Sequence, residues 1–258
     1  MSRELIIKNG FVAKQKMIQS LFGDKKKSDK FIATAVQIAS DYKLSECHPN
    51  SIIDACVHVA QMGLDLNPTL SHAYLVPFKK SVQLIVSARG YTALLSRTGW
   101  KVKSYIVNED DYFEYSVNGF DEKVKFEKNL DSENDDLKYA VALAQSPDGT
   151  LYVEVMNKTQ IEKHRKVSSN QKGAKATGVW AEWYDEMALK TVIKKLVKRL
   201  PIGEDVAMAL SVDDKPIEAE IVKEDKVDLN SMAAEPHDPI TGEVDLLSGI
   251  DVEVGSDE

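Results

Sequence analysis

The run KTVIKKLVKRLP, residues 190–201, places five cations and five large aliphatic residues in one uninterrupted stretch. At about 100° per residue, an α-helix would gather the aliphatic side chains in one sector and the cations on the opposite half. Several cations stand four residues apart with no glutamate between them, and each such pair opposes helix formation by roughly 0.2–0.5 kcal/mol. Lys and Arg also neutralise phosphate groups. The run therefore predicts either a solvated basic face or a surface that binds a phosphate backbone.

Other residues that could do chemistry form no catalytic pattern. A phosphate-binding G-x-x-x-x-G-K-[ST] motif is absent, so the sequence does not support ATPase chemistry. The spacing of Cys47, His48, Cys56 and His58 does not match a zinc site. The acidic stretch NEDD, residues 108–111, could hold Mg²⁺, but no nucleophilic or basic partner lies near it in the sequence. We expect no required cofactor, with Mg²⁺ at most a modulator.

Charge is divided unevenly along the chain, whose formal net charge is −8. Residues 211–258 carry 15 Asp and Glu against three lysines, whereas residues 1–210 carry 30 basic against 26 acidic residues. We therefore predict two regions, a basic core over 1–210 and an acidic, mostly disordered tail over 211–258.

Three roles are open for the tail. It could compete with nucleic acid for the basic face of the core, or dock a partner protein through the segment EVDLLSGIDVEV, residues 243–254. The third reading is an appendage that only improves solubility.

The compartment is predicted from the cysteines and from hydropathy. Two cysteines among apolar neighbours cannot form a disulfide framework, which favours buried thiols in a reducing compartment. No signal peptide and no run of about 18 apolar residues is visible. These features predict a cytoplasmic protein.

The elements that must position the basic run follow from periodicity. Apolar spacing predicts helices over residues 29–44, 50–63 and 90–99, and strands over 72–78, 82–87, 100–107, 122–128, 138–144 and 151–156. The turn sequence SPDG, residues 146–149, joins the last two strands as a hairpin. Helices, antiparallel strands enclosing a short helix, and then a long basic helix near the end of the core predict an α+β fold, an antiparallel sheet with packed helices.

The basic helix is expected to begin near residues 177–178 and to end at Pro201. Thr159 and Glu162 fit a capping box that opens a shorter helix before it. The polar, basic stretch between the two, residues 166–178, predicts a loop that is mobile until an anion orders it, or else a solvated linker. The aromatic residues that follow the loop, Trp180, Trp183 and Tyr184, are more typical of core anchors than of base-stacking platforms.

Several blocks of the sequence resemble the RecT/Red beta family of phage recombinases. The strongest are GLDLNP (63–68), HAYLVP (72–77) and QLIVSARG (83–90), within a similar region that extends from 48 to 99. The segments 107–119 and 179–201 resemble two further blocks in the same order. The resemblance covers roughly residues 30–201, and several blocks in register are far more specific than any single motif.

This resemblance implies an ATP-independent protein, not an enzyme, that binds single-stranded DNA and anneals complementary strands during recombination. It also implies assembly with itself into rings or helical filaments, binding of the annealed duplex, and a partner exonuclease. A host single-strand binding protein is a further expected partner, and a phage or prophage gene in a bacterial host is the expected source. The residues agree with the chemistry, because annealing needs neutralised phosphates and exposed bases rather than a catalytic group.

The DNA-contact residues that we predict are basic or aromatic side chains of the matching blocks and of the basic loop. They are Lys79, Lys80, Arg89, Tyr91, Arg97, Lys103, Lys172, Lys175, Lys190, Lys194, Lys195, Lys198 and Arg199. No catalytic and no metal residue is predicted.

The sequence departs from the family pattern at two places. Ser71 stands where members often have Gly, and Ser87-Ala88 stands where Gly followed by an aromatic residue is usual. Tyr91 or Tyr74 would then have to supply any stacking. Other matching residues are expected to serve the scaffold, and they are Gly63, Asn67, Pro68, Pro77 and Gly90.

Two other function classes remain open from the residues alone. A passive single-strand DNA-binding protein would share the basic core and the acidic tail. A Mg²⁺-dependent DNA-processing enzyme could use the acids at 109–111.

Overall fold

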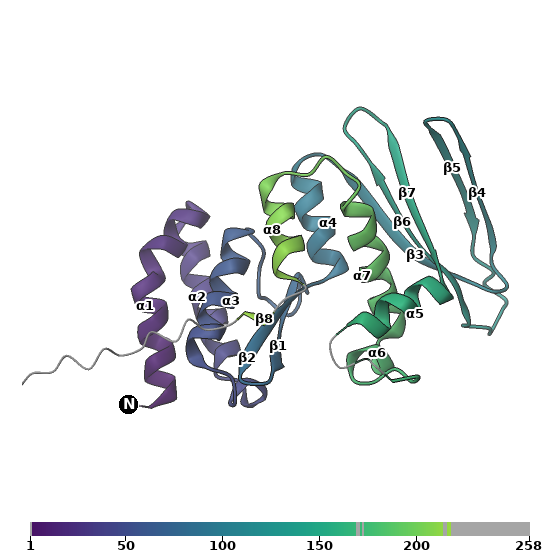
Figure 1. Ribbon diagram of the computed structural model, residues 1–258. Helices are drawn as coiled ribbons and strands as arrows, with labels where there is room; N and C mark the ends of the chain where they lie inside the picture. The colour runs from purple at the N-terminus through teal and green to yellow at the C-terminus, as the bar shows by residue number, and fades with distance from the viewer. Residues whose placement is uncertain (1, 169–170, 172, 214–215, 218–258) are drawn as a thin grey trace, which may run out of the picture. The chain divides into compact units, whose positions relative to one another are not determined.

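The computed structural model describes residues 2–168, 171, 173–213 and 216–217 (Figure 1). The chain divides into two compact units, Met1–Glu220 and Ile221–Glu258, and every described residue belongs to the first. Helix α8, Glu204–Val212, runs across the domain boundary that the charge distribution predicted at residue 210. The segment 243–254, proposed to dock a partner, lies outside the described residues.

The described residues form an α+β fold, as predicted. The helices are α1 (Arg3–Phe22), α2 (Lys25–Ala39), the 3-10 helix η1 (Tyr42–Leu44), α3 (Pro49–Gln61), α4 (Ala88–Arg97), α5 (Lys158–Val167), α6 (Val179–Glu182), α7 (Tyr184–Val197) and α8. The strands are β1 (Ala73–Phe78), β2 (Ser81–Val86), β3 (Lys101–Asn108), β4 (Tyr112–Asn118), β5 (Asp121–Glu127), β6 (Leu137–Gln145), β7 (Leu151–Asn157) and β8 (Pro216–Ile217).

The strands form three antiparallel sheets, in the orders β1-β2-β8, β3-β6-β7 and β4-β5. The predicted β1–β2 pair and the hairpin at the SPDG turn are both present. Strand β4 was not predicted, because polar residues interrupt its apolar alternation and most of its side chains are exposed. Its pairing with β5 comes from the hydrogen-bond register Tyr112 to Asn118 against Glu127 to Asp121.

The alternation of β6 explains how sheet β3-β6-β7 is covered on both faces. Ala140, Ala142 and Ala144 face the main core that includes the apolar side of α7, and their small side chains allow the helix to pack close to the sheet. Val141 faces the opposite way, into a second cluster with residues of the β4–β5 hairpin. Figure 1 shows α5 and α7 on one side of this sheet and the hairpin on the other.

The N-terminal helices α1, α2 and α3 pack on one another. Helix α1 was not predicted, because its buried residues Ile7, Phe11 and Ile18 are mixed with apolar residues that stay exposed. Its N-terminus is capped by the Ser2 side chain, and it ends at Gly23 in the left-handed conformation. None of the helices in the described part of the chain is long and apolar enough to cross a membrane.

The helix predicted to carry the basic run is two helices, and the run itself lies on the second of them, α7, and the turn that follows it. The predicted long helix is interrupted at Trp183, where the backbone leaves helical geometry at φ −134° and ψ 52°, so that α6 and α7 are separate. Trp180 is buried, as expected of a core anchor, whereas Trp183 is exposed. The capping box of α5 is formed by Asn157 and Gln160 instead of the predicted Thr159 and Glu162.

Scaffold roles are visible at three positions that the sequence singled out. Gly63, two residues after the end of α3, has φ 62°. Ser71 has φ 53°, a left-handed backbone conformation that explains why Gly is favoured at that position. A Cβ atom on Gly90 would lie 2.3 Å from the backbone oxygen of His72, so only glycine allows α4 to approach β1 this closely.

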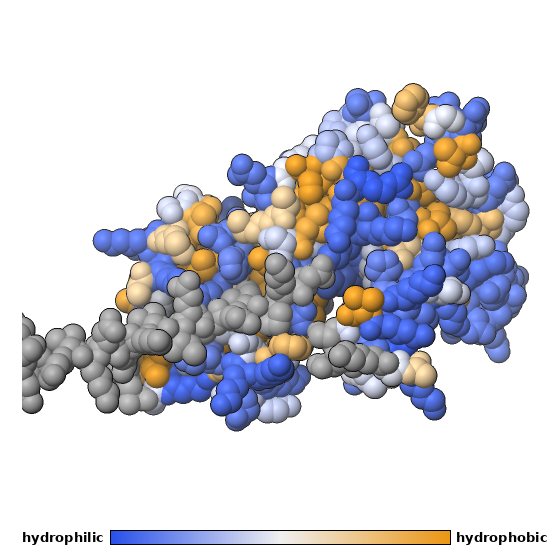
Figure 2. Space-filling view, in the orientation of Figure 1, coloured by the Kyte–Doolittle hydropathy of each residue, from blue (hydrophilic) through white to orange (hydrophobic). Residues whose placement is uncertain are grey.

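The space-filling view shows a mostly hydrophilic face, with hydrophobic residues gathered near α4 and α8 (Figure 2).

Candidate nucleic-acid interface

The first two lysines of the basic run face a buried carboxylate. Lys190 Nζ lies 2.8 Å from Asp213 Oδ1, and Lys194 Nζ lies 2.9 Å from Asp213 Oδ2. The side chains of Lys190, Lys194 and Asp213 are 13%, 12% and 1% exposed. Burial alone would raise the pKa of Asp213, but the two ammonium groups and their hydrogen bonds hold that pKa below its usual value.

Two of the later cations of the run, Lys195 and Arg199, are paired with a second buried acid. Glu154, on β7, lies 2.7 Å from Lys195 Nζ and 3.0 Å from an Arg199 guanidinium nitrogen. Arg199 also donates to the backbone oxygen of Val153 and lies 3.9 Å from Glu122 of β5. No acid lies among these cations in the sequence, and the structure offsets their repulsion with Asp213 and Glu154, which reach them from distant segments.

The end of α7 keeps an accessible positive surface. Lys198 is exposed and forms no ion pair with any residue that the structure describes. Burial lowers the pKa of His164 on α5, and the nearby charges of Lys195 and Lys198 lower it further. Two more exposed lysines, Lys163 and Lys166, lie on α5.

The predicted residues of the central block divide into two exposed cations, of which Arg97 is hydrogen-bonded to the backbone, and one buried aromatic ring. Arg89 is exposed, with no ion pair to another described residue. Arg97 donates to the backbone oxygens of Met62 and Gly63 and so caps the end of α3. Tyr91 is 0% exposed, so its ring has no free face for a base, and the expectation that it stacks on DNA does not fit this packing. Tyr74, the other aromatic candidate, is exposed.

The remaining candidates that the structure describes are exposed but scattered. Lys79 and Lys80 lie at the turn between β1 and β2, where Lys79 has φ 55° and lies 5.7 Å from the centre of the Phe78 ring. Lys103 lies on β3, and Lys175 lies in the loop before α6. Lys172 is outside the described residues. A role in DNA contact stays a prediction for all of them.

The loop before α6 is organised by a buried arginine that sequence reasoning missed. The Arg165 guanidinium lies against Glu162, 2.8 Å away, and donates to the backbone oxygens of Gly173, Ala174 and Lys175. Gln171 links the same loop by donating to the Thr177 oxygen at 2.7 Å. The described part of this loop is thus held by contacts within the protein, whereas the sequence predicted either a loop that an anion orders or a solvated linker.

Replacing Arg165 with alanine should release this loop. The Thr177 amide donates to Gln171 Oε1, which itself lies 3.4 Å from Arg165, so we expect this amide to exchange about tenfold faster with solvent. Amide hydrogen exchange measures the change, and Lys166→Ala, on the exposed side of α5, is the matched control. Unchanged exchange at Thr177 would show that Arg165 does not hold the loop.

The acids of the NEDD stretch have structural partners. Asp111 accepts hydrogen bonds from the backbone amides of Asn108 and Asn129 and from Lys128, and these contacts lower its pKa against the effect of burial. Asp110 accepts from Ser132. These bonds fasten the turn after β3, and in the described part of the chain no group of three or more His, Cys, Asp or Glu is placed to hold a metal ion.

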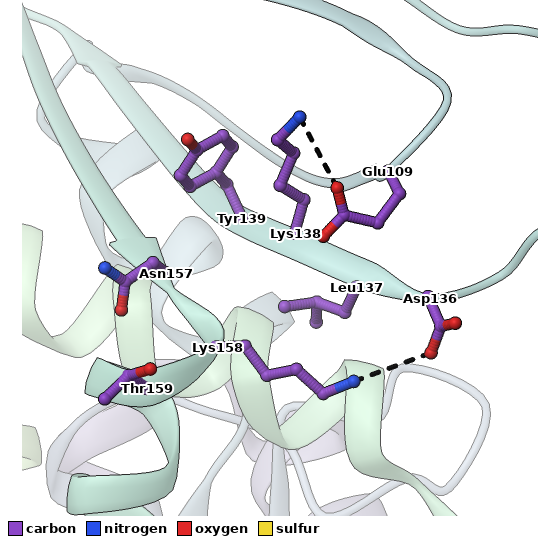
Figure 3. Close-up of a pocket in the computed structure, with 8 residues that line it drawn as sticks. All are labelled: Glu109, Asp136, Leu137, Lys138, Tyr139, Asn157, Lys158 and Thr159. Carbon is purple, nitrogen blue, oxygen red and sulfur yellow. Dashed lines mark ion pairs between the residues drawn. The ribbon is translucent and has the colours of Figure 1, made fainter.

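An open, polar cavity of about 500 Å³ lies beside this turn. Figure 3 shows its lining residues and the ion pairs Lys138–Glu109 and Lys158–Asp136, each with a nitrogen–oxygen distance of 3.5 Å. Both acids that line it therefore form ion pairs with lysines.

Cys47 and Cys56 are buried free thiols, as expected.

Comparison with known proteins places this chain in a family. The model of the RecT family matches residues 29–228, so the chain belongs to the RecT family. Protein RecT of Escherichia coli (strain K12) is 35% identical over 182 residues, which cover 67% of this chain and 65% of that protein. Uncharacterized protein YqaK of Bacillus subtilis (strain 168) is 25% identical over 243 residues, which cover 90% of this chain and 83% of YqaK. The chain thus spans slightly less than two thirds of the length of the E. coli protein, and all of α1 lies before the family match.

Proposed function

We propose that this protein binds single-stranded DNA and anneals complementary strands in recombination, without ATP and without catalysis. The observation that carries the proposal is the RecT family match over residues 29–228. The matched region includes α4, with the exposed Arg89, and α7, with the exposed Lys198. Assembly into rings or filaments, an exonuclease partner and a host single-strand binding protein belong to the same proposal, as does the absence of a required cofactor.

The mechanism that we propose needs only binding. Exposed Lys and Arg side chains neutralise phosphates of a bound strand, which lowers its repulsion toward a second strand. Bases that stay unpaired and accessible then test complementarity, so specificity comes from base pairing and not from side chains.

An annealing assay tests this proposal against its two rivals. Two complementary labelled strands are mixed with Mg²⁺, with and without protein, and in the absence of ATP. Accelerated formation of duplex supports annealing. Protection of the strands without faster annealing would support a passive binding protein, and shortened strands would support a DNA-processing enzyme.

Lys198→Gln should weaken single-strand binding while leaving the fold intact, because the side chain is exposed at the end of α7. Loss of one phosphate contact is expected to reduce the slope of log K against log salt concentration by about 0.7. Fluorescence titrations of a labelled oligothymidylate over a range of salt concentrations measure this slope. Lys43→Gln, an equal loss of charge at an exposed position of η1, is the control. Equal slopes for the two variants would remove Lys198 from the interface.

A further inference from the structure

Four donors from three elements converge on the carboxylate of Asp213, at the end of α8. Asp213 Oδ1 accepts from Lys190 Nζ and from the backbone amide of Val86, each at 2.8 Å. Asp213 Oδ2 accepts from Lys194 Nζ at 2.9 Å, and the Tyr91 hydroxyl lies 3.4 Å from it. The donors come from α7, from the end of β2 and from α4.

This arrangement requires an anion. Lys190 and Lys194 stand four residues apart on one helix, where like charges repel, and both are largely removed from water. Two ammonium groups and a backbone N–H are also donors that bind a phosphate oxygen well. The cluster therefore has the composition of a phosphate-binding site whose present occupant is a side chain of the same chain.

The element that carries Asp213 is held by few buried groups. Helix α8 fully buries only Val206 and Ala209 among its own residues, and its N-cap, Gly203, gives no side-chain cap. Met208, Leu210 and Val212 of the same helix are partly buried against the core. After Asp213, strand β8 pairs with β2 through two residues, and one of them is Pro216, which has no N–H to donate. Such an element belongs to the part of a fold that opens at low free energy.

We propose that Lys190, Lys194 and the Val86 amide form a binding site for a phosphate of single-stranded DNA, and that Asp213 occupies this site when no DNA is bound. The inference rests on the proposed function, because it names the phosphate site and its competitor within the same interface. Binding of the strand displaces the carboxylate, α8 moves away from α7, and dissociation of the strand lets Asp213 return.

Asp213→Asn tests the competition directly. Asparagine keeps the shape and an acceptor for the Val86 amide but loses the charge that holds the lysines, whose long side chains can still reach water. We expect the variant to bind oligothymidylate about tenfold more tightly at low salt, the size of one gained charge-assisted contact. Asp205→Asn, an equal charge change at an exposed position of the same helix, is the control and should change the affinity much less.

The gain must also depend on the two lysines. In the background Lys190→Gln with Lys194→Gln, adding Asp213→Asn should give no increase in affinity. An increase that persists in this background, or one that Asp205→Asn reproduces, would overturn the proposal.

Hydrogen exchange of the unaltered protein gives a second measurement that does not depend on how the variants fold. With saturating oligothymidylate, the amides of residues 204–212 should exchange faster than in the free protein, whereas a purely structural Asp213 predicts equal or slower exchange. Absence of oligothymidylate binding by the unaltered protein would overturn the proposed function. Normal binding with unchanged exchange in α8 and unchanged affinity of Asp213→Asn would overturn this inference alone.

Discussion

Replacing Lys190 and Lys194 together with glutamine is expected to lower the free energy of unfolding by about 3–5 kcal/mol. The physical reason is Asp213, whose side chain is 1% exposed and would be left as a buried charge without a cationic partner. Denaturant unfolding followed by circular dichroism measures the change. From the sequence alone these lysines would have been placed on a solvated face, where the same substitution leaves the fold unchanged.

Two controls separate this effect from a general loss of helix stability. Adding Asp213→Asn to the double variant should restore much of the stability, because no charge then remains buried at this site. Lys198→Gln, at an exposed position, should change the free energy of unfolding by less than about 0.5 kcal/mol. If the free energy of unfolding of the double variant lies within about 0.5 kcal/mol of the value for the unaltered protein, Asp213 does not depend on Lys190 and Lys194 for stability.

The pH dependence of stability should change in the same variant. The pKa of Asp213 is lower in the folded than in the unfolded state. Its ionised carboxylate therefore stabilises the fold above the unfolded-state pKa, and this stabilisation is lost as the pH falls through the folded-state pKa. Without Lys190 and Lys194, burial remains and raises the pKa of Asp213 instead. The double variant should therefore regain stability, relative to the unaltered protein, as the solution becomes acidic.

Gly90→Ala is expected to destabilise the protein by about 3 kcal/mol, at the upper end of the range for overpacked sites. The added Cβ would lie 2.3 Å from the backbone oxygen of His72 and 2.9 Å from Val86 Cγ1. Backbone cannot rotate away as a side chain can, so α4 would have to shift from the β1–β2 sheet. Thermal and denaturant unfolding of the variant measure the loss.

Gly173→Ala is the matched control for this prediction, because the added Cβ would meet its nearest atom, the Lys175 oxygen, only at 3.8 Å. We expect a change below about 1 kcal/mol at this loop position. Similar losses at both positions would show that chain flexibility, and not the contact with His72, explains the requirement for glycine.

Much of the fold could be predicted because the signals are local. Apolar spacing located α3, α4 and the strand pairs β1–β2 and β6–β7, since each buries one face against the core and repeats with its own period. Helix α1 and strand β4 were missed because their exposed apolar or polar residues blur that period. The break at Trp183 was missed because the residues around it fit a continuous helix.

Residue types and their spacing along the chain were enough to predict the α+β class, the basic character of α7 and the resemblance to a family of DNA-annealing proteins. Which cations are accessible followed from the tertiary structure alone. Asp213 pairs with Lys194 across 19 residues of sequence, Glu154 pairs with Arg199 across 45, and Tyr91 enters the core beside α8. The physical reason is that an ion pair or a buried ring depends on distance in space and on desolvation, and neither is encoded by periodicity.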